Sequence, residues 1–146
     1  MKTLLNRIAV REPYFALKDL VLMGPGSITA RTPREVIDHG EAQQMNAAEV
    51  GRHLAILGSL SCAQLQKSDD KHYYLAVEAD LKREDYDAVM VMAEYESGIA
   101  RAQGCLLDKR NSSAHCTLAF GDDIWTLDVK YKVIPERIFE KIYHNR

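Results

Sequence analysis

The sequence has few cysteines, glycines and prolines, and these shortages limit the kinds of protein that it can encode. Three cysteines, eight glycines and four prolines stand among 146 residues. The cysteines form no CxxC pair and show no metal-ligand spacing, so we expect neither a disulfide framework nor a bound metal or other cofactor. Cys62, Cys105 and Cys116 are expected to be reduced, buried thiols, which indicates a cytoplasmic protein.

Charge of one sign and long apolar runs are also missing. The net charge is −2 without a basic block, so nucleic-acid binding has little electrostatic support. No apolar run reaches the roughly 18 residues of a membrane span, and Asn6 and Arg7 interrupt the apolar start, which argues against a signal peptide. The remaining composition, 47% hydrophobic and 27% charged, is typical of one globular domain over residues 1–146.

Residues 45–66 are predicted to form a long buried helix, because apolar residues recur at helical spacing on more than one face. A stripe of small residues follows one side of this helix: Gly51, Ala55, Gly58 and Cys62. Interior glycines cost a helix about 1 kcal/mol each relative to alanine, so the stripe indicates that another backbone approaches closely. The alternative is that Gly51 and Gly58 are merely tolerated.

The rest of the chain reads mostly as strands. Strands are predicted at 14–22, 27–31, 73–83, 88–97, 100–107, 113–120 and 124–133, joined by short turns typical of antiparallel neighbours. In the strand at 73–83, alternation places Tyr73, Leu75, Val77, Ala79 and Leu81 on one face. Capping signals predict short helices after Thr32 and after Pro135, the latter with Ile138, Phe139 and Ile142 on its apolar face. The order predicts an α+β fold, one antiparallel sheet of six or seven strands around one buried helix.

This order resembles the hot-dog fold, in which a long antiparallel sheet is wrapped around one central helix. The start of the helix, Asn46-Ala47-Ala48-Glu49, resembles that of FcoT-like long-chain acyl-CoA thioesterases. The resemblance implies an acyl-thioester substrate carried by CoA or an acyl-carrier protein, a homodimer or dimer of dimers with an acyl tunnel between subunits, and a catalytic role for Asn46.

The chemistry expected at the helix start follows from its polar residues. Glu49 is a candidate general base or nucleophile, and His39 and His53 are candidate partners in proton transfer. Asn46 and the free N–H groups of the helix start would polarise the thioester carbonyl. Ala47, Val50 and Arg52 are the expected substrate contacts. The structural alternatives stay open: Asn46 as a helix cap, Glu49 paired with Arg52 or His53, and the histidines as packing or loop residues.

Two further functions remain alongside thioester hydrolysis. Hot-dog dehydratases place an acid 14 residues after a loop histidine, whereas here His39 is followed at that distance by His53. A non-catalytic acyl-CoA-binding protein would keep the pocket and lack the chemistry. A CoA substrate would favour basic residues at the tunnel mouth, for which Lys82, Arg83, Lys109 and Arg110 are candidates, although ordinary solubility explains them equally well.

Overall fold

The computed structural model describes residues 7–8, 17–32, 47–67, 70–84, 98–120 and 123–144. Its elements, in chain order, are β1 (Lys18–Gly24), β2 (Ser27–Arg31), α2 (Ala47–Leu65), β3 (His72–Glu84), β4 (Ile99–Asp108), β5 (Asn111–Phe120), β6 (Asp123–Pro135) and α3 (Glu136–His144). The predicted α+β order is confirmed for these elements. The strand predicted at 88–97 and the short helix predicted after Thr32 fall on residues outside the described ones.

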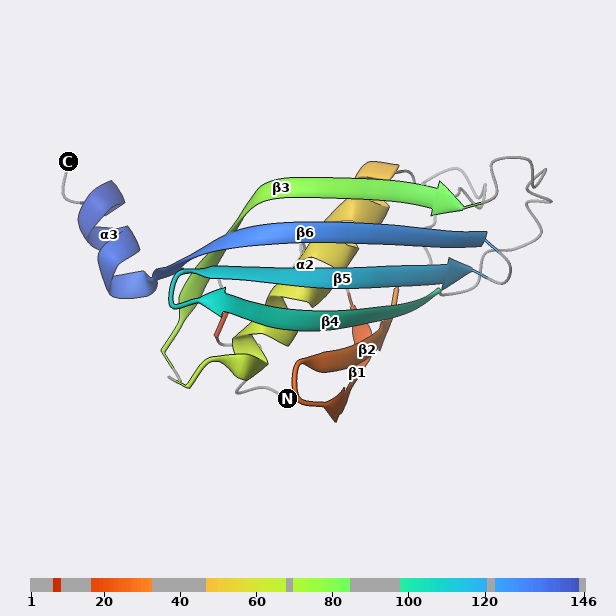
Figure 1. The fold of residues 1–146 in the computed structure, drawn as a ribbon, viewed down its shortest axis with the longest axis horizontal. Coiled ribbons are helices and arrows are strands. Elements are labelled where there is room, and N and C mark those ends of the chain that lie inside the picture. Colours follow the sequence, from red (N-terminus) through yellow and green to blue (C-terminus); the bar gives the residue numbers. More distant parts are fainter. Residues whose placement is uncertain are drawn as a thin grey trace, which may run out of the picture.

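The named strands form one six-stranded sheet in the order β1-β2-β4-β5-β6-β3, and all neighbouring pairs are antiparallel. Helix α2 crosses one face of this sheet at an angle to the strands, and α3 lies beyond the end of β6 (Figure 1). Within the described residues, no helix is both long enough and apolar enough to cross a membrane.

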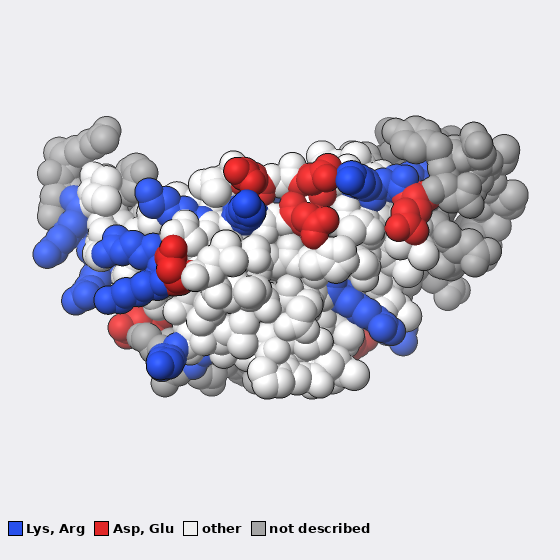
Figure 2. Space-filling view, in the orientation of Figure 1, with Lys and Arg blue, Asp and Glu red and all other residues white. Residues whose placement is uncertain are grey.

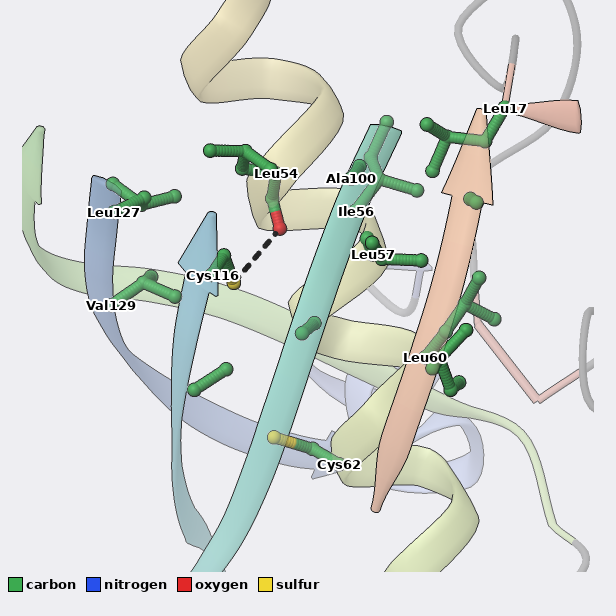
Figure 3. Packing of buried hydrophobic residues seen from close by; sticks show 14 of the residues in the cluster. Leu17, Leu54, Ile56, Leu57, Leu60, Cys62, Ala100, Cys116, Leu127 and Val129 are labelled. Atoms are coloured by element: carbon green, nitrogen blue, oxygen red, sulfur yellow. Dashed lines mark hydrogen bonds between the residues drawn. The ribbon is translucent and has the colours of Figure 1, made fainter. Parts of the chain in front are cut away.

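Helix α2 forms the centre of the hydrophobic core. Leu54, Leu57 and Leu60 are fully buried, and their neighbours come from β2, β4, β5 and β6 (Figure 3). Two buried serines sit in the same helix, and each hydroxyl donates to a backbone carbonyl three residues earlier, Ser59 to Ile56 and Ser61 to Gly58, at 2.6 Å. These bonds satisfy hydroxyl groups that would otherwise be costly to bury.

At Gly58 the small-residue stripe allows the expected close approach between α2 and the sheet. A Cβ atom there would lie 2.5 Å from Tyr131 Oη, 3.0 Å from Ala114 Cβ and 3.1 Å from Cys116 Sγ. From the sheet side, a Cβ on Gly104 would lie 2.8 Å from the backbone of α2 at Ser61. At Gly51 the corresponding distance is 3.7 Å to Leu81, an ordinary contact, so the prediction of a close approach is wrong at Gly51.

Three local predictions are corrected by the structure. A β-bulge between Ala76 and Glu78 changes the face of β3, so Leu81 packs against the core while Val77 is 60% exposed, and Leu75 and Ala79 are exposed as well. Such an extra residue reverses the alternation on either side of it. In α3, Ile142 is 48% exposed, whereas Phe139 stacks on the Tyr73 ring of β3 with ring centroids 3.9 Å apart. Cys105 is exposed on β4, unlike the other two cysteines.

Candidate functional site

The polar residues predicted for the site lie on the first two turns of α2. Glu49 is half-buried, Arg52 is exposed and His53 is fully buried. Their spacing of three and four residues places them on adjoining positions of the helix surface. Glu49 stands in the first turn, where the partial positive charge of the helix start favours a carboxylate.

The protonation of His53 is set mainly by its burial. Burial, with a smaller contribution from the Arg52 guanidinium, lowers the pKa of His53 to about 4, although the Glu49 carboxylate acts in the opposite direction. The imidazole is therefore neutral at neutral pH, so one ring nitrogen carries a proton and the other can accept one. The charges of Arg52 and Glu49 both act on the His53 ring, so these three residues form one electrostatic group.

A pocket of about 240 Å³, here called the helix pocket, opens between the middle of α2, from Arg52 to Ser59, and strands β3 and β6. Its lining residues are Ile8, Arg52, Ala55, Ile56, Ser59, Tyr73, Tyr74, Ala76 and Tyr131. Most of this lining is apolar or aromatic, which suits an aliphatic chain. Two of its hydroxyls are already committed to the helix backbone: Tyr131 donates to the Ala55 carbonyl at 2.5 Å, and Ser59 bonds within α2.

The predicted site residues are only partly brought together by the described structure. Arg52 lines the helix pocket, whereas Val50 is buried in the core and Ala47 is exposed at the first residue of α2. Asn46 and His39 lie outside the described residues, so their predicted roles stay predictions.

The sequence reading missed Tyr131 as a pocket residue. Alternation along β6 places it on the same face as the buried Leu127, Val129 and Val133, and this pattern was the available signal. Tyr74 packs against the core and lies edge-on to Tyr131, with ring centroids 5.8 Å apart. Burial raises the pKa of both phenols, so both remain protonated at neutral pH.

The two buried cysteines are poor candidates for a nucleophile. Burial raises the pKa of Cys62 to about 11, and it raises that of Cys116 as well. Their thiols donate to backbone carbonyls, Cys62 to Ser113 at 3.3 Å and Cys116 to Leu54 at 3.4 Å, the latter drawn in Figure 3. A thiol held in this form lacks the thiolate that attacks a carbonyl. Within the described part of the chain, no three His, Cys, Asp or Glu residues are grouped to hold a metal ion.

Comparison with known proteins gives structural matches only. No family model and no curated protein matches the sequence. The structure is similar to that of a thioesterase family protein from Silicibacter pomeroyi, with a TM-score of 0.59 and 19% identity over 80% of this chain and 84% of that one. It is also similar to a mutant thioesterase from Pseudomonas aeruginosa (TM-score 0.58, 14% identity, covering 80% of each chain). A third similar structure is a thioesterase from Haemophilus influenzae (0.57, 13%, covering 80% and 78%).

These similarities agree with the topology described above. One long helix crosses one face of an antiparallel sheet (Figure 1), and the similar thioesterase-family structures match this chain over most of their length. At 13–19% identity to these three structures, the likeness defines the fold and leaves the reaction open. The chain therefore has the hot-dog fold of thioesterase-family proteins.

Proposed function

We propose that the protein hydrolyses an acyl thioester of CoA or an acyl-carrier protein, with the acyl chain beside α2. One observation carries this proposal: in a hot-dog fold, Glu49 and His53 lie on the same two turns of α2 as Arg52. Arg52 in turn lines the apolar helix pocket. A thioester substrate needs this combination, an apolar binding surface next to groups that activate water and polarise a carbonyl.

In the proposed reaction, Glu49 takes a proton from a water molecule whose oxygen attacks the thioester carbonyl carbon. Asn46 and the N–H groups at the start of α2 stabilise the negative charge that develops on the carbonyl oxygen. Collapse of the tetrahedral intermediate breaks the carbon–sulfur bond, and the thiolate leaves. The neutral His53 orients Glu49 or the water through hydrogen bonds, and His39 is assigned to the same group. Ala47, Val50 and Arg52 are the proposed substrate contacts.

The order of Asn46 and Glu49 at the helix start resembles that of FcoT-like long-chain thioesterases, and this resemblance is the reason for assigning a catalytic role to Asn46 in the proposal. The three free cysteines fit the cytoplasmic location that we propose for the protein.

The test is release of free thiol from acyl-CoA substrates of increasing chain length, compared among wild type, Asn46→Ala and Glu49→Gln. Glu140→Gln is the matched control, because Glu140 is an exposed carboxylate on α3, outside the proposed site and the proposed dimer contact. We expect both site variants to lose about 100-fold or more of the activity while remaining folded, and the control to keep it. Saturable acyl-CoA binding without thiol release would contradict hydrolysis, and a change in enoyl-CoA absorbance would then identify a dehydratase.

We further propose that the protein is a homodimer, or a dimer of dimers, paired through β3. This strand is at one edge of the sheet, and its residues 75–80 are all exposed, including Leu75 and Val77. A long exposed edge with apolar side chains tends to pair with another strand, and two antiparallel β3 strands would give a two-fold symmetric contact. Light scattering should show Val77→Lys as a smaller species. Val21→Lys, at the opposite edge, should keep the wild-type mass, and the reverse result would reject β3 as the contact.

A further inference from the structure

A second pocket, here called the cationic pocket, lies at the C-terminal end of α2, away from the proposed active site. It encloses about 460 Å³ where the end of α2, the β4–β5 turn and the start of α3 meet. Its lining consists of Gln66, Lys67, His72, Leu106, Asp108, Lys109, Arg110, Pro135, Arg137 and Ile138. Lys and Arg side chains gather at this end of the molecule (Figure 2), although the chain as a whole carries a net charge of −2.

Four basic side chains reach this pocket from three separate segments. Lys67 follows α2, Lys109 and Arg110 form the β4–β5 turn, and Arg137 stands in the first turn of α3. None of them forms an ion pair with an acidic side chain in the described part of the chain. Positive charges brought together in this way repel one another and attract anions into the hollow between them.

Asp108, which also lines the pocket, is committed to holding the turn. One carboxylate oxygen accepts hydrogen bonds from the Arg110 backbone N–H at 2.8 Å and from Asn111 Nδ2 at 2.9 Å. These bonds, that from Arg110 first, hold the pKa of Asp108 below its usual range. The carboxylate therefore stays charged and fixes the turn that presents Lys109 and Arg110.

The negative end of the α2 dipole explains at most one of the four cations. Lys67 is close enough in sequence to interact with it, but the other three belong to different elements. The carbonyl of Ala63 at this helix end already accepts from Arg7 Nη1 at 3.1 Å and from the Gln66 backbone N–H at 3.2 Å. Stabilisation of the helix end therefore leaves most of the positive charge unexplained.

The floor of the pocket indicates what kind of anion would fit. Leu106, Pro135 and Ile138 supply apolar surface, and the His72 ring beside them is held by a hydrogen bond from Nδ1 to the Asp70 carbonyl at 2.7 Å. A single carboxylate would neutralise one of the four cations, whereas phosphate groups would neutralise several. The volume lies in the range of pockets that enclose small organic ligands.

We infer that the cationic pocket binds a small organic phosphate with several negative charges on an apolar, aromatic body, as in a nucleoside diphosphate. The phosphates would contact Lys109, Arg110 and Arg137, and the base would lie on the apolar floor. Two sources share this chemistry, a free nucleotide and the nucleotide part of CoA. The inference does not depend on the proposed hydrolysis, because the cationic pocket is separate from the first turns of α2.

Calorimetric titration of the full chain with ADP, CoA, pyrophosphate and decanoate tests the inference. The test variant is Arg110→Ala/Arg137→Ala, and the control Lys18→Ala/Arg101→Ala removes the same charge from exposed positions elsewhere. We expect the test variant to bind ADP at least about tenfold more weakly than wild type, the control to stay within about twofold, and added salt to weaken binding. Unchanged circular dichroism of both variants is the check on folding.

The outcomes separate the sources and the alternatives. If wild type binds ADP and the test variant does not, the ligand is a free nucleotide. If the test variant loses only the binding of CoA, the ligand is the nucleotide part of CoA. Failure of both ADP and CoA to bind, or equal binding by wild type and test variant, overturns the inference. Preferential binding of decanoate in this pocket also overturns it, because a fatty carboxylate would then be the ligand. All readouts are binding measurements, so they are independent of thiol release.

Discussion

Replacing Gly58 by alanine adds one methyl group at the closest contact between α2 and the sheet. The new Cβ would meet Tyr131 Oη at 2.5 Å, Ala114 Cβ at 3.0 Å and Cys116 Sγ at 3.1 Å. Tyr131 is buried and its hydroxyl bonds to the Ala55 carbonyl, so it has little freedom to move away. The helix or the sheet must shift instead.

The expected magnitude is the balance of three terms. Alanine is favoured over glycine in a helix by about 1 kcal/mol. Overpacking a dense core costs about 1–3 kcal/mol, and weakening the Tyr131 hydrogen bond costs about 1 kcal/mol more. We therefore expect Gly58→Ala to lower the free energy of unfolding by about 1–3 kcal/mol. Gly51→Ala on the same helix meets only Leu81 at 3.7 Å, so it should raise this free energy by up to about 1 kcal/mol.

Urea unfolding followed by fluorescence of the single tryptophan, Trp125, measures both variants at one protein concentration. The double variant Gly58→Ala/Tyr131→Phe removes the nearest clashing atom. Its loss of stability should therefore be smaller than the sum of the two single-variant losses, by about 0.5 kcal/mol or more. Stabilisation by Gly58→Ala equal to that by Gly51→Ala would refute the reasoning, because it would mean that the contact at Gly58 is not tight.

Three further predictions concern buried polar groups and thiols. The pKa of His53 falls from 6.5 to about 4 on folding, so between these pH values only the unfolded state binds the proton. The free energy of unfolding should therefore decrease by about 3 kcal/mol as the pH is lowered from 6.5 to 4. In urea titrations, His53→Gln should remove this part of the pH dependence. Thr32→Val should lower stability by about 1–3 kcal/mol in the same assay, with Thr32→Ser milder, since the buried Gly98 N–H loses its acceptor at 3.0 Å. Alkylation of the native protein should label Cys105 quickly and Cys62 slowly, and a Cys105→Ser variant that still reacts quickly would contradict this difference.

Most of the fold could be predicted because the periodic spacing of apolar residues indicates helices and strands. The helix at 45–66 and the strand at 27–31 were located within about two residues, since apolar spacing and turn residues act locally. The phase of β3 could not be predicted from alternation, because the bulge between Ala76 and Glu78 depends on pairing with β6, a strand about 50 residues later. Exposure of Cys105 likewise depends on which face of β4 covers α2.

The candidate site was less predictable than the fold. Glu49 and His53 were singled out because polar groups on a buried helix are unusual, and their roles, like that of Arg52, stay predictions. Tyr131 reaches the helix pocket from β6 through long-range packing, for which the sequence gives only alternation. Local patterns therefore identify residues that share an element, and tertiary packing identifies those that meet from different elements.

The spacing between α2 and the sheet differs along the helix, and the helix pocket lies beside its tightest point. At Gly58, and where Gly104 meets the helix backbone at Ser61, the two layers are in closest contact. Near Gly51 an added Cβ would meet one side chain at ordinary distance, so the layers are farther apart at the start of α2. The helix pocket is lined from Arg52 to Ser59 and by Tyr131, so it extends along the middle of α2 to the tight contact at Gly58. The same Tyr131 ring thus packs against Gly58 and forms part of the pocket wall, so the small residue at position 58 affects both the packing of α2 and the shape of the pocket.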